Sequence, residues 1–365
     1  MILPEHLRKA IVDDHLLFSC QFEVTWKCNE ACVHCYQRVD RKLVYPKSVA
    51  AASDDLRAEL KTDEILRILG ELRQEGCFFL TLTGGDPLVR RDFKQIAQRA
   101  HDLGFVLSIM TNGLRIDRSM ADFLAELNIH RVEISIYGAC AETHDAVTQV
   151  RGSFDKTLQA IRLLVERGVR VYLKNCILRP AFEEVEAMEA LAASFGDAID
   201  FVASAEIVPR NDGSLDVMKW ALTNEQLRQL FRRQIEQDSQ TAPLPRIAEP
   251  AKADDGGHAM CGIGDSGINI NPLGHVYACV SLPFVCGDLR KQPLHEIWQD
   301  GEFFRYLKGL RNSDLESVDS AANGFRCPGG SYLEHGDLTR MSTEASRMGA
   351  AWEAAEQGLV QIRFS

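Results

Sequence analysis

The sequence lacks any uninterrupted apolar run approaching about 18 residues, so no segment is expected to span a membrane. Its first 20 residues carry charges throughout and contain no apolar core, which argues against a signal peptide and predicts a cytoplasmic protein. Positive charge is also scarce, because 41 Lys and Arg stand against 52 Asp and Glu, a formal net charge of −11. Phosphate backbones are bound by positive surfaces, so nucleic acid is not expected as the main partner.

The rest of the composition is that of an ordinary globular enzyme. Apolar residues make up 45% and charged residues 25% of the chain, a balance that excludes a disordered protein. Its 365 residues allow two or three domains, or one large domain with an appendage, at roughly 100–200 residues per domain. The 11 cysteines are expected to be metal ligands or buried thiols rather than disulfides, because no export signal precedes them.

Short apolar strands alternate with amphipathic helices from about residue 20 to residue 210. The expected strands are Phe22–Lys27, Phe78–Thr83, Val106–Thr111, His130–Ile136, Val169–Leu178 and Asp200–Val208. This alternation predicts an α/β fold with a parallel sheet and right-handed crossovers. A TIM barrel needs eight such units and about six are counted, so a partial (β/α)6 barrel is expected. Chemistry in these folds collects at the carboxyl ends of the strands.

The pattern changes after residue 237. A stretch rich in Pro, Ala, Asp and Gly predicts a linker, followed by a β-hairpin over 267–280 and helices around Leu294–Leu310 and Arg340–Glu356. We therefore expect a small α+β domain after the barrel. The expected boundaries are an N-terminal extension over 1–19, the barrel over 20–237, a linker over 238–258, the small domain over 259–335 and a helical segment over 336–365.

The most informative stretch is Cys28-Asn-Glu-Ala-Cys32-Val-His-Cys35, in the loop after the first strand. Three thiols this close cannot all pair as disulfides, but they can all reach one metal centre. A structural zinc ion would need a fourth ligand, whereas three thiolates suit a 4Fe–4S cluster that leaves one iron open. The alternative is a zinc knuckle or a chance cluster of cysteines.

The C-x3-C-x2-C spacing resembles the hallmark of the radical S-adenosylmethionine (radical SAM) enzymes. The resemblance implies that S-adenosylmethionine binds the open iron and is cleaved reductively, and that the resulting 5′-deoxyadenosyl radical takes a hydrogen atom from a substrate. Other positions match the family in order, over roughly residues 20–210. Gly84-Gly85-Asp86-Pro87 resembles the family's GGE motif, with Asp86 in place of the usual Glu and expected to accept a hydrogen bond from the methionine ammonium.

The same resemblance implies further contacts to S-adenosylmethionine near the ends of later strands. Ribose and carboxylate contacts are expected from Asn112, Ser135 and Asn175, and Tyr36 is expected to pack near the adenine. The alternative for each polar residue is a turn former without a ligand.

A second set of cysteines follows the linker, namely Cys261, Cys279, Cys286 and Cys327. The C-x12-G-x4-C spacing from Cys261 to Cys279 resembles the start of the SPASM/Twitch extension of many radical SAM enzymes. The full SPASM pattern has more cysteines, so the resemblance implies one auxiliary 4Fe–4S cluster. Cys286 is a candidate fourth ligand, and the alternative is that it is a buried core thiol.

Relatives with such an extension mostly modify ribosomally made peptides by oxidation, cross-linking or epimerisation, and others act on sugars or aminocyclitols. Peptide maturation is favoured, with a separate leader-binding protein as partner because few residues precede the first strand. A sugar or aminocyclitol remains the alternative substrate, and a non-enzymatic metal-binding protein is the distant one. The reductant is expected to be a donor such as flavodoxin or ferredoxin.

Overall fold

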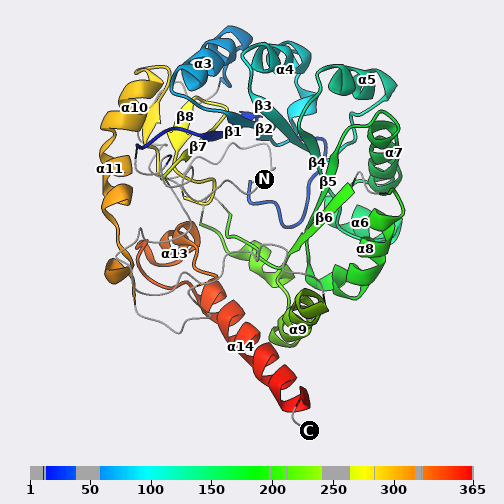
Figure 1. The fold of residues 1–365 in the computed structure, drawn as a ribbon. Coiled ribbons are helices and arrows are strands. Elements are labelled where there is room, and N and C mark those ends of the chain that lie inside the picture. The colour runs from blue at the N-terminus through cyan, green and yellow to red at the C-terminus, as the bar shows by residue number, and fades with distance from the viewer. Residues whose placement is uncertain are drawn as a thin grey trace.

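The computed structural model describes residues 11, 14–37, 58–196, 199–210, 213–240, 264–282, 284–316, 322 and 324–363. Within these residues the strands form one sheet in the order β6-β5-β4-β3-β2-β1-β7-β8-β9. Figure 1 shows that this sheet is curved and that helices α3, α4, α5 and α7 lie on its outer side. The sheet does not close on itself, because β6 and β9 are its two edges.

The first six strands are parallel and confirm the expected partial barrel. They are β1 Ser19–Thr25, β2 Phe79–Gly84, β3 Val106–Thr111, β4 Arg131–Ser135, β5 Val171–Cys176 and β6 Ile199–Ser204. The helices between them are α3 Thr62–Gln74, α4 Phe93–Asp102, α5 Arg118–Glu126, α6 Ala141–Thr148, α7 Ser153–Val165 and α8 Val185–Ala193, with the short 3-10 helices η1 Pro87–Val89 and η2 Arg179–Glu184.

Side chains along β1 alternate between the hydrophobic core under the helices and the inside of the barrel. Cys20, Phe22 and Val24 are buried in the main hydrophobic core. Successive side chains of a strand point to opposite faces, so Gln21 and Glu23 face the inside of the curve instead. The helices supply the other half of the core, as the buried stripe Ile65, Ile68, Leu69 and Leu72 of α3 shows.

The C-terminal hairpin continues the barrel sheet. Its strands are β7 Gly267–Ile270 and β8 His275–Tyr277, and a third short strand, β9 Gly287–Asp288, pairs with β8. Strand β7 pairs in parallel with β1, with Ser19 opposite Gly267 and Phe22 opposite Ile270. The sequence predicts the hairpin but not this pairing, which gives the free edge of β1 a partner from the small domain.

The remaining elements follow β6 or the hairpin strands in the chain. Their bounds are η3 Asp216–Trp220, α9 Asn224–Gln240, α10 Leu294–Asp300, α11 Glu302–Gly309, η4 Asn312–Asp314, α13 Pro328–His335 and α14 Thr343–Arg363. Figure 1 shows α10 beside α3. In Figure 1, α14 runs from α13 past α9, and the ring of Trp352 packs against Phe231 of α9 at 5.3 Å. Most of the expected linker, from residue 241 on, lies outside the described residues. None of the helices in the described part of the chain is long and apolar enough to cross a membrane.

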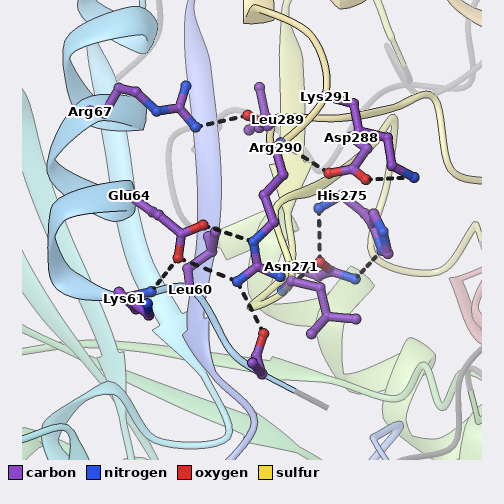
Figure 2. A network of polar contacts seen from close by, with 12 residues as sticks. Leu60, Lys61, Glu64, Arg67, Asn271, His275, Asp288, Leu289, Arg290 and Lys291 are labelled. Atoms are coloured by element: carbon purple, nitrogen blue, oxygen red, sulfur yellow. Dashed lines mark hydrogen bonds and ion pairs between the residues drawn. The ribbon is translucent and has the colours of Figure 1, made fainter. Parts of the chain in front are cut away.

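Hydrogen bonds of Arg290 and Arg67 join the small domain to α3, and we call these contacts the polar clamp (Figure 2). The Arg290 guanidinium donates to Glu64 Oε1 at 2.8 Å and to the carbonyl of Ala58 at 3.1 Å. Arg67 donates to the carbonyl of Leu289 at 2.8 Å. The hydrogen bond from Arg290 holds the pKa of Glu64 below its usual value. The clamp therefore fixes the loop after β9 against the first helix of the barrel.

We expect Arg290→Ala to lower the free energy of unfolding by about 1–2 kcal/mol, because the bond to Glu64 is charge-assisted and partly buried. The matched control is Arg228→Ala, since Arg228 forms an exposed pair with Glu225 within one helix and should cost less than about 0.5 kcal/mol. Urea denaturation of both variants measures the difference. Equal losses would show that the clamp contributes no more than a surface ion pair.

Candidate cofactor and substrate site

A cavity of about 400 Å³ opens at the carboxyl ends of the barrel strands. The cysteine loop after β1 and the ends of β2, β3 and β4 line one side of it. The segment after β6 and the hairpin strands β7 and β8 line the other side. The cavity therefore lies where the sequence predicts the chemistry, with the small domain contributing part of the wall.

All three cysteines of the first cluster line this cavity, and all three are free thiols. The loop is held from outside by backbone bonds from Ala31 to the Thr148 carbonyl and from Val33 to the Val147 carbonyl, each 3.0 Å. Arg210 adds a bond to the Cys35 carbonyl at 2.7 Å. The loop between Cys28 and Cys35 is thus anchored through its backbone, which leaves the thiols available to a ligand.

Burial raises the pKa of Cys28 to about 12 and that of Cys35 to about 11, and raises the pKa of Cys32 as well. Without a cation these groups are therefore neutral thiols at pH 7, and a bound metal centre must displace their protons. Among the described residues, no three His, Cys, Asp or Glu side chains form a site for a single ion. A four-iron cluster spreads its thiolates over separate irons, so three cysteines on one loop fit it.

Gly84, the last residue of β2, and Gly85 are required by the close approach of two backbone segments. The amide of Gly85 donates to the Thr25 carbonyl at 2.7 Å, and the amide of Asp86 donates to the Lys27 carbonyl at 2.9 Å. A Cβ at Gly84 would overlap the Thr25 carbonyl oxygen, and one at Gly85 would overlap that of Lys27. Gly84 also has φ +142°, which other residues rarely adopt. Both glycines line the cavity, as expected.

Asp86, expected to contact the methionine ammonium, lies behind the cavity wall. It is 0% exposed, and neither it nor Pro87 lines the cavity. Its Oδ1 accepts from the amide of Leu88 at 2.9 Å, and its Oδ2 accepts from Thr111 Oγ1 at 2.7 Å and the Asn112 amide at 2.9 Å. Burial raises its pKa while these bonds oppose the shift. The carboxylate therefore joins the loop after β2 to the end of β3.

We expect Asp86→Asn to lower the free energy of unfolding by about 1–3 kcal/mol. Both carboxylate oxygens accept hydrogen bonds, and the amide NH2 of asparagine would replace one of these oxygens and face a hydrogen-bond donor without accepting from it. Urea denaturation of the cluster-free protein measures this loss. The control is Asp155→Asn on the exposed first turn of α7, expected within about 0.5 kcal/mol of wild type. Unchanged stability with weaker binding of S-adenosylmethionine would instead support the expected contact between Asp86 and the methionine ammonium.

The other expected cofactor residues divide between the cavity and the wall behind it. Tyr36, Asn112 and Ser135 line the cavity. The Asn112 side chain also donates to Asn29 Oδ1 at 2.7 Å, which links β3 to the cysteine loop. Asn175 does not line the cavity; it is buried and donates to the Ile136 carbonyl at 2.6 Å. Its position therefore favours a structural role.

The second set of cysteines is brought together only in part within the described residues. Cys327 caps α13, where its thiol accepts from the Gly330 amide at 3.4 Å. A Cβ at Gly329 would lie 2.5 Å from the Ser281 carbonyl, so the start of α13 touches the turn that follows Cys279. Cys286 packs against the main core, and burial raises its pKa to about 12. This packing favours the alternative of a core thiol, while Cys261 lies outside the described residues.

Sequence reasoning missed three glutamates that line the cavity, Glu23, Glu30 and Glu206. Glu23 is 7% exposed and accepts from Tyr36 Oη at 2.6 Å and Gln37 Nε2 at 2.7 Å. Burial raises the pKa of Glu30 to about 7. No Lys or Arg is among the described residues lining the cavity. The glutamate at position 23 of β1 was a signal in the sequence, because a buried parallel strand is expected to be apolar at every position.

Comparisons with known proteins agree with this arrangement. The profile of the Radical SAM superfamily matches residues 22–192, and that of the SPASM iron-sulfur cluster-binding domain matches residues 261–327. The mycofactocin maturase MftC of Mycolicibacterium smegmatis is 30% identical over 300 residues, which cover 79% of this chain and 71% of MftC. The AdoMet-dependent heme synthase of Methanosarcina barkeri is 29% identical over 304 residues, covering 79% of this chain and 83% of the synthase.

A solved structure shares the fold over most of its length. It is Streptococcus suis SuiB bound to the precursor peptide SuiA, with a TM-score of 0.66 and 14% identity over 93% of this chain and 79% of SuiB. At that identity the likeness shows the fold alone. The cavity, the cysteine loop and the hairpin thus lie in a fold of known type.

Proposed function

This chain belongs to the radical SAM superfamily and carries a SPASM domain, and from this premise we propose that it matures a ribosomally made peptide. Its cofactors are S-adenosylmethionine and a catalytic 4Fe–4S cluster. In addition, the SPASM domain is an auxiliary iron–sulfur cluster-binding domain. When bound, cluster and S-adenosylmethionine supply a 5′-deoxyadenosyl radical that takes a hydrogen atom from the substrate.

The residues of this chain supply binding and orientation. Cys28, Cys32 and Cys35 would hold the catalytic cluster, because they are the thiols on the cavity side of the loop. The backbone at Gly84 and Gly85, with Asn112 and Ser135, would hold S-adenosylmethionine at the ends of β2, β3 and β4, beside Tyr36. Asp86 supports that wall from behind. In the SPASM domain, Cys261, Cys279 and Cys327 would hold the auxiliary cluster.

The observation that carries the choice of a peptide is the charge of the cavity. Glu23, Glu30 and Glu206 line it, and no lysine or arginine does so among the described residues. A haem-type substrate, suggested by the heme synthase relative, carries carboxylates that such a wall would repel. A neutral or cationic peptide segment fits, as the relative that is a mycofactocin maturase suggests. A cationic aminocyclitol meets the same charge condition and is the second candidate.

The proposal includes two partners. A separate leader-binding protein would present the precursor peptide, and a reductant of the flavodoxin or ferredoxin kind would supply electrons to the catalytic cluster.

The test is turnover of candidate precursor peptides in heavy water, followed by mass spectrometry. We expect a peptide to lose two hydrogens, or to keep its composition apart from solvent deuterium taken up during epimerisation. The inactive control is the protein with Cys28, Cys32 and Cys35 all changed to alanine. If no peptide changes while an aminocyclitol stimulates 5′-deoxyadenosine formation, peptide maturation is overturned.

A further inference from the structure

One wall of the cavity is built jointly by the barrel and the small domain. In the parallel pair of β1 and β7, Gln21 lies opposite Asn269. These residues line the cavity together with Glu23, Asn271 and Tyr277, and we call these five residues the β1–β7 wall. Their neighbours Phe22 and Ile268 are buried in the core on the opposite face. The strand alternation therefore directs a polar row into the cavity.

The hydrogen bonds of this wall leave two acceptor oxygens open. Asn271 is fully used, because its Oδ1 accepts from the amides of Leu273 and His275 at 3.0 Å each and its Nδ2 donates to Tyr277 Oη at 3.0 Å (Figure 2 shows its bonds to the turn). Asn269 Oδ1, in contrast, is buried and has no hydrogen-bond partner among the described residues. Buried polar atoms are nearly always paired, so an unpaired one on a residue that lines a cavity points to a ligand.

Glu23 supplies the second open oxygen. Its Oε1 accepts the short bonds from Tyr36 and Gln37, whereas Oε2 accepts, within the described part of the chain, a single long bond from Trp26 Nε1 at 3.4 Å. None of the ion pairs between described residues involves Glu23. The three side chains that donate to it, Tyr36, Gln37 and Trp26, are neutral. Burial raises the pKa of nearby Tyr277 above its usual range, and the Glu23 charge adds to that shift, so Tyr277 is neutral as well. A buried carboxylate without a cation attracts one.

We propose that the β1–β7 wall binds a protonated nitrogen of the substrate, whose N–H groups donate to Glu23 Oε2 and Asn269 Oδ1. This rests on the proposed function, in which the cation is a lysine or arginine side chain of the peptide. The wall lies on the β7 side of β1, while the residues proposed for S-adenosylmethionine follow β2, β3 and β4 on the other side. The two sites meet at Glu23, which accepts from Tyr36 of the cofactor site, and the SPASM hairpin contributes Asn269 to the substrate site.

The experiment uses the reconstituted full-length protein with S-adenosylmethionine bound. The probes are acetyl-Gly-Gly-Xaa-Gly-Gly-amide peptides with lysine, arginine, glutamine or glutamate in the centre, and ethylguanidinium chloride as a cation without a peptide. Dissociation constants are measured by ligand-observed NMR. The variants are Glu23→Gln, which keeps the shape and removes the charge, and Asn269→Leu. The matched control is Glu133→Gln, because Glu133 is a 2% exposed barrel glutamate outside the cavity lining.

We expect the lysine and arginine peptides to bind at least about tenfold more tightly than the glutamine and glutamate peptides. Glu23→Gln and Asn269→Leu should each weaken cation binding by about 10- to 100-fold, the range for losing a hydrogen bond to a charged group. Glu133→Gln should bind the peptides like wild type, and the affinity of Asn269→Leu and Glu133→Gln for S-adenosylmethionine should stay within about twofold of wild type. Glu23→Gln also alters the acceptor of the Tyr36 hydroxyl, so its S-adenosylmethionine affinity is measured separately and its peptide affinities are compared at saturating S-adenosylmethionine.

Peptides that bind regardless of their central residue, or that bind Glu23→Gln as well as wild type, would overturn the β1–β7 wall and leave peptide maturation standing. Glu23-dependent binding of the lysine and arginine peptides or of ethylguanidinium would support the wall. Binding of none of the probes to wild type would overturn the wall, while the turnover of precursor peptides in heavy water decides peptide maturation independently.

Discussion

Changing Cys28, Cys32 and Cys35 together to alanine is expected to reduce anaerobic formation of 5′-deoxyadenosine to background. The three thiols line the same cavity on one anchored loop, so their loss removes every cysteine ligand of the proposed catalytic cluster. Reconstituted, reduced protein is incubated with S-adenosylmethionine, and the product is measured by chromatography. Wild-type cleavage retained in the triple variant would contradict the assignment of these cysteines.

Iron content distinguishes loss of one cluster from loss of the fold. If both centres are four-iron clusters, wild type should hold about eight irons per chain and the triple variant about four, retained by the SPASM domain. The control is Cys140→Ala, since Cys140 is an exposed thiol that does not line the cavity, and cleavage should be unchanged. Background iron in the triple variant would show that the C-terminal cysteines hold no cluster.

The second large effect is expected from Gly84→Ala, which should lower the free energy of unfolding by about 3–5 kcal/mol. The new Cβ would overlap the Thr25 carbonyl oxygen, and alanine would be strained at φ +142°. Backbone on both sides is fixed by the β1–β2 pairing, so the clash cannot be relieved by a side-chain movement. Urea denaturation of the cluster-free protein measures the loss.

Gly70→Ala is the matched control, because Gly70 lies inside α3 and a Cβ there would meet no atom within 4 Å. Alanine should stabilise the protein by about 0.5–1 kcal/mol, since glycine is unfavourable inside a helix. A destabilisation by Gly84→Ala no larger than that of an ordinary surface change would show that the two loops can separate without cost.

Strands and most helices could be predicted because local patterns specify them. The expected strand Val106–Thr111 has the observed bounds, and the expected hairpin begins at Gly267, as observed. The alternation of strands and amphipathic helices does not predict α6, because its eight residues show little amphipathic character. The range 294–310 contains two helices, α10 and α11, because the chain leaves helical geometry at Gly301. Such breaks depend on tertiary packing rather than on local sequence.

The sequence predicts which residues lie at the ends of the barrel strands, but not which of their side chains line the cavity. Motif order places Asp86 and Asn175 at the ends of strands, which is where the structure has them. Successive residues of a strand point to opposite faces, so a shift by one residue decides whether a side chain lines the cavity or lies in the wall behind it. Residues in loops do not follow this alternation, so their side chains cannot be assigned to either side from the sequence. The pairing of β1 with β7 joins segments about 250 residues apart, so no local signal could reveal that Asn269 shares a wall with Glu23.

That pairing also has a consequence for synthesis on the ribosome. Strand β1 is made early, but its β7 partner emerges only after residue 270. At about 5–20 residues per second, β1 waits roughly 10–50 seconds with one edge unpaired. An open strand edge can recruit other chains, so nascent copies on one messenger are exposed to misassembly during that interval. Slower translation of residues 26–266 would lengthen this interval and should lower the yield of folded protein.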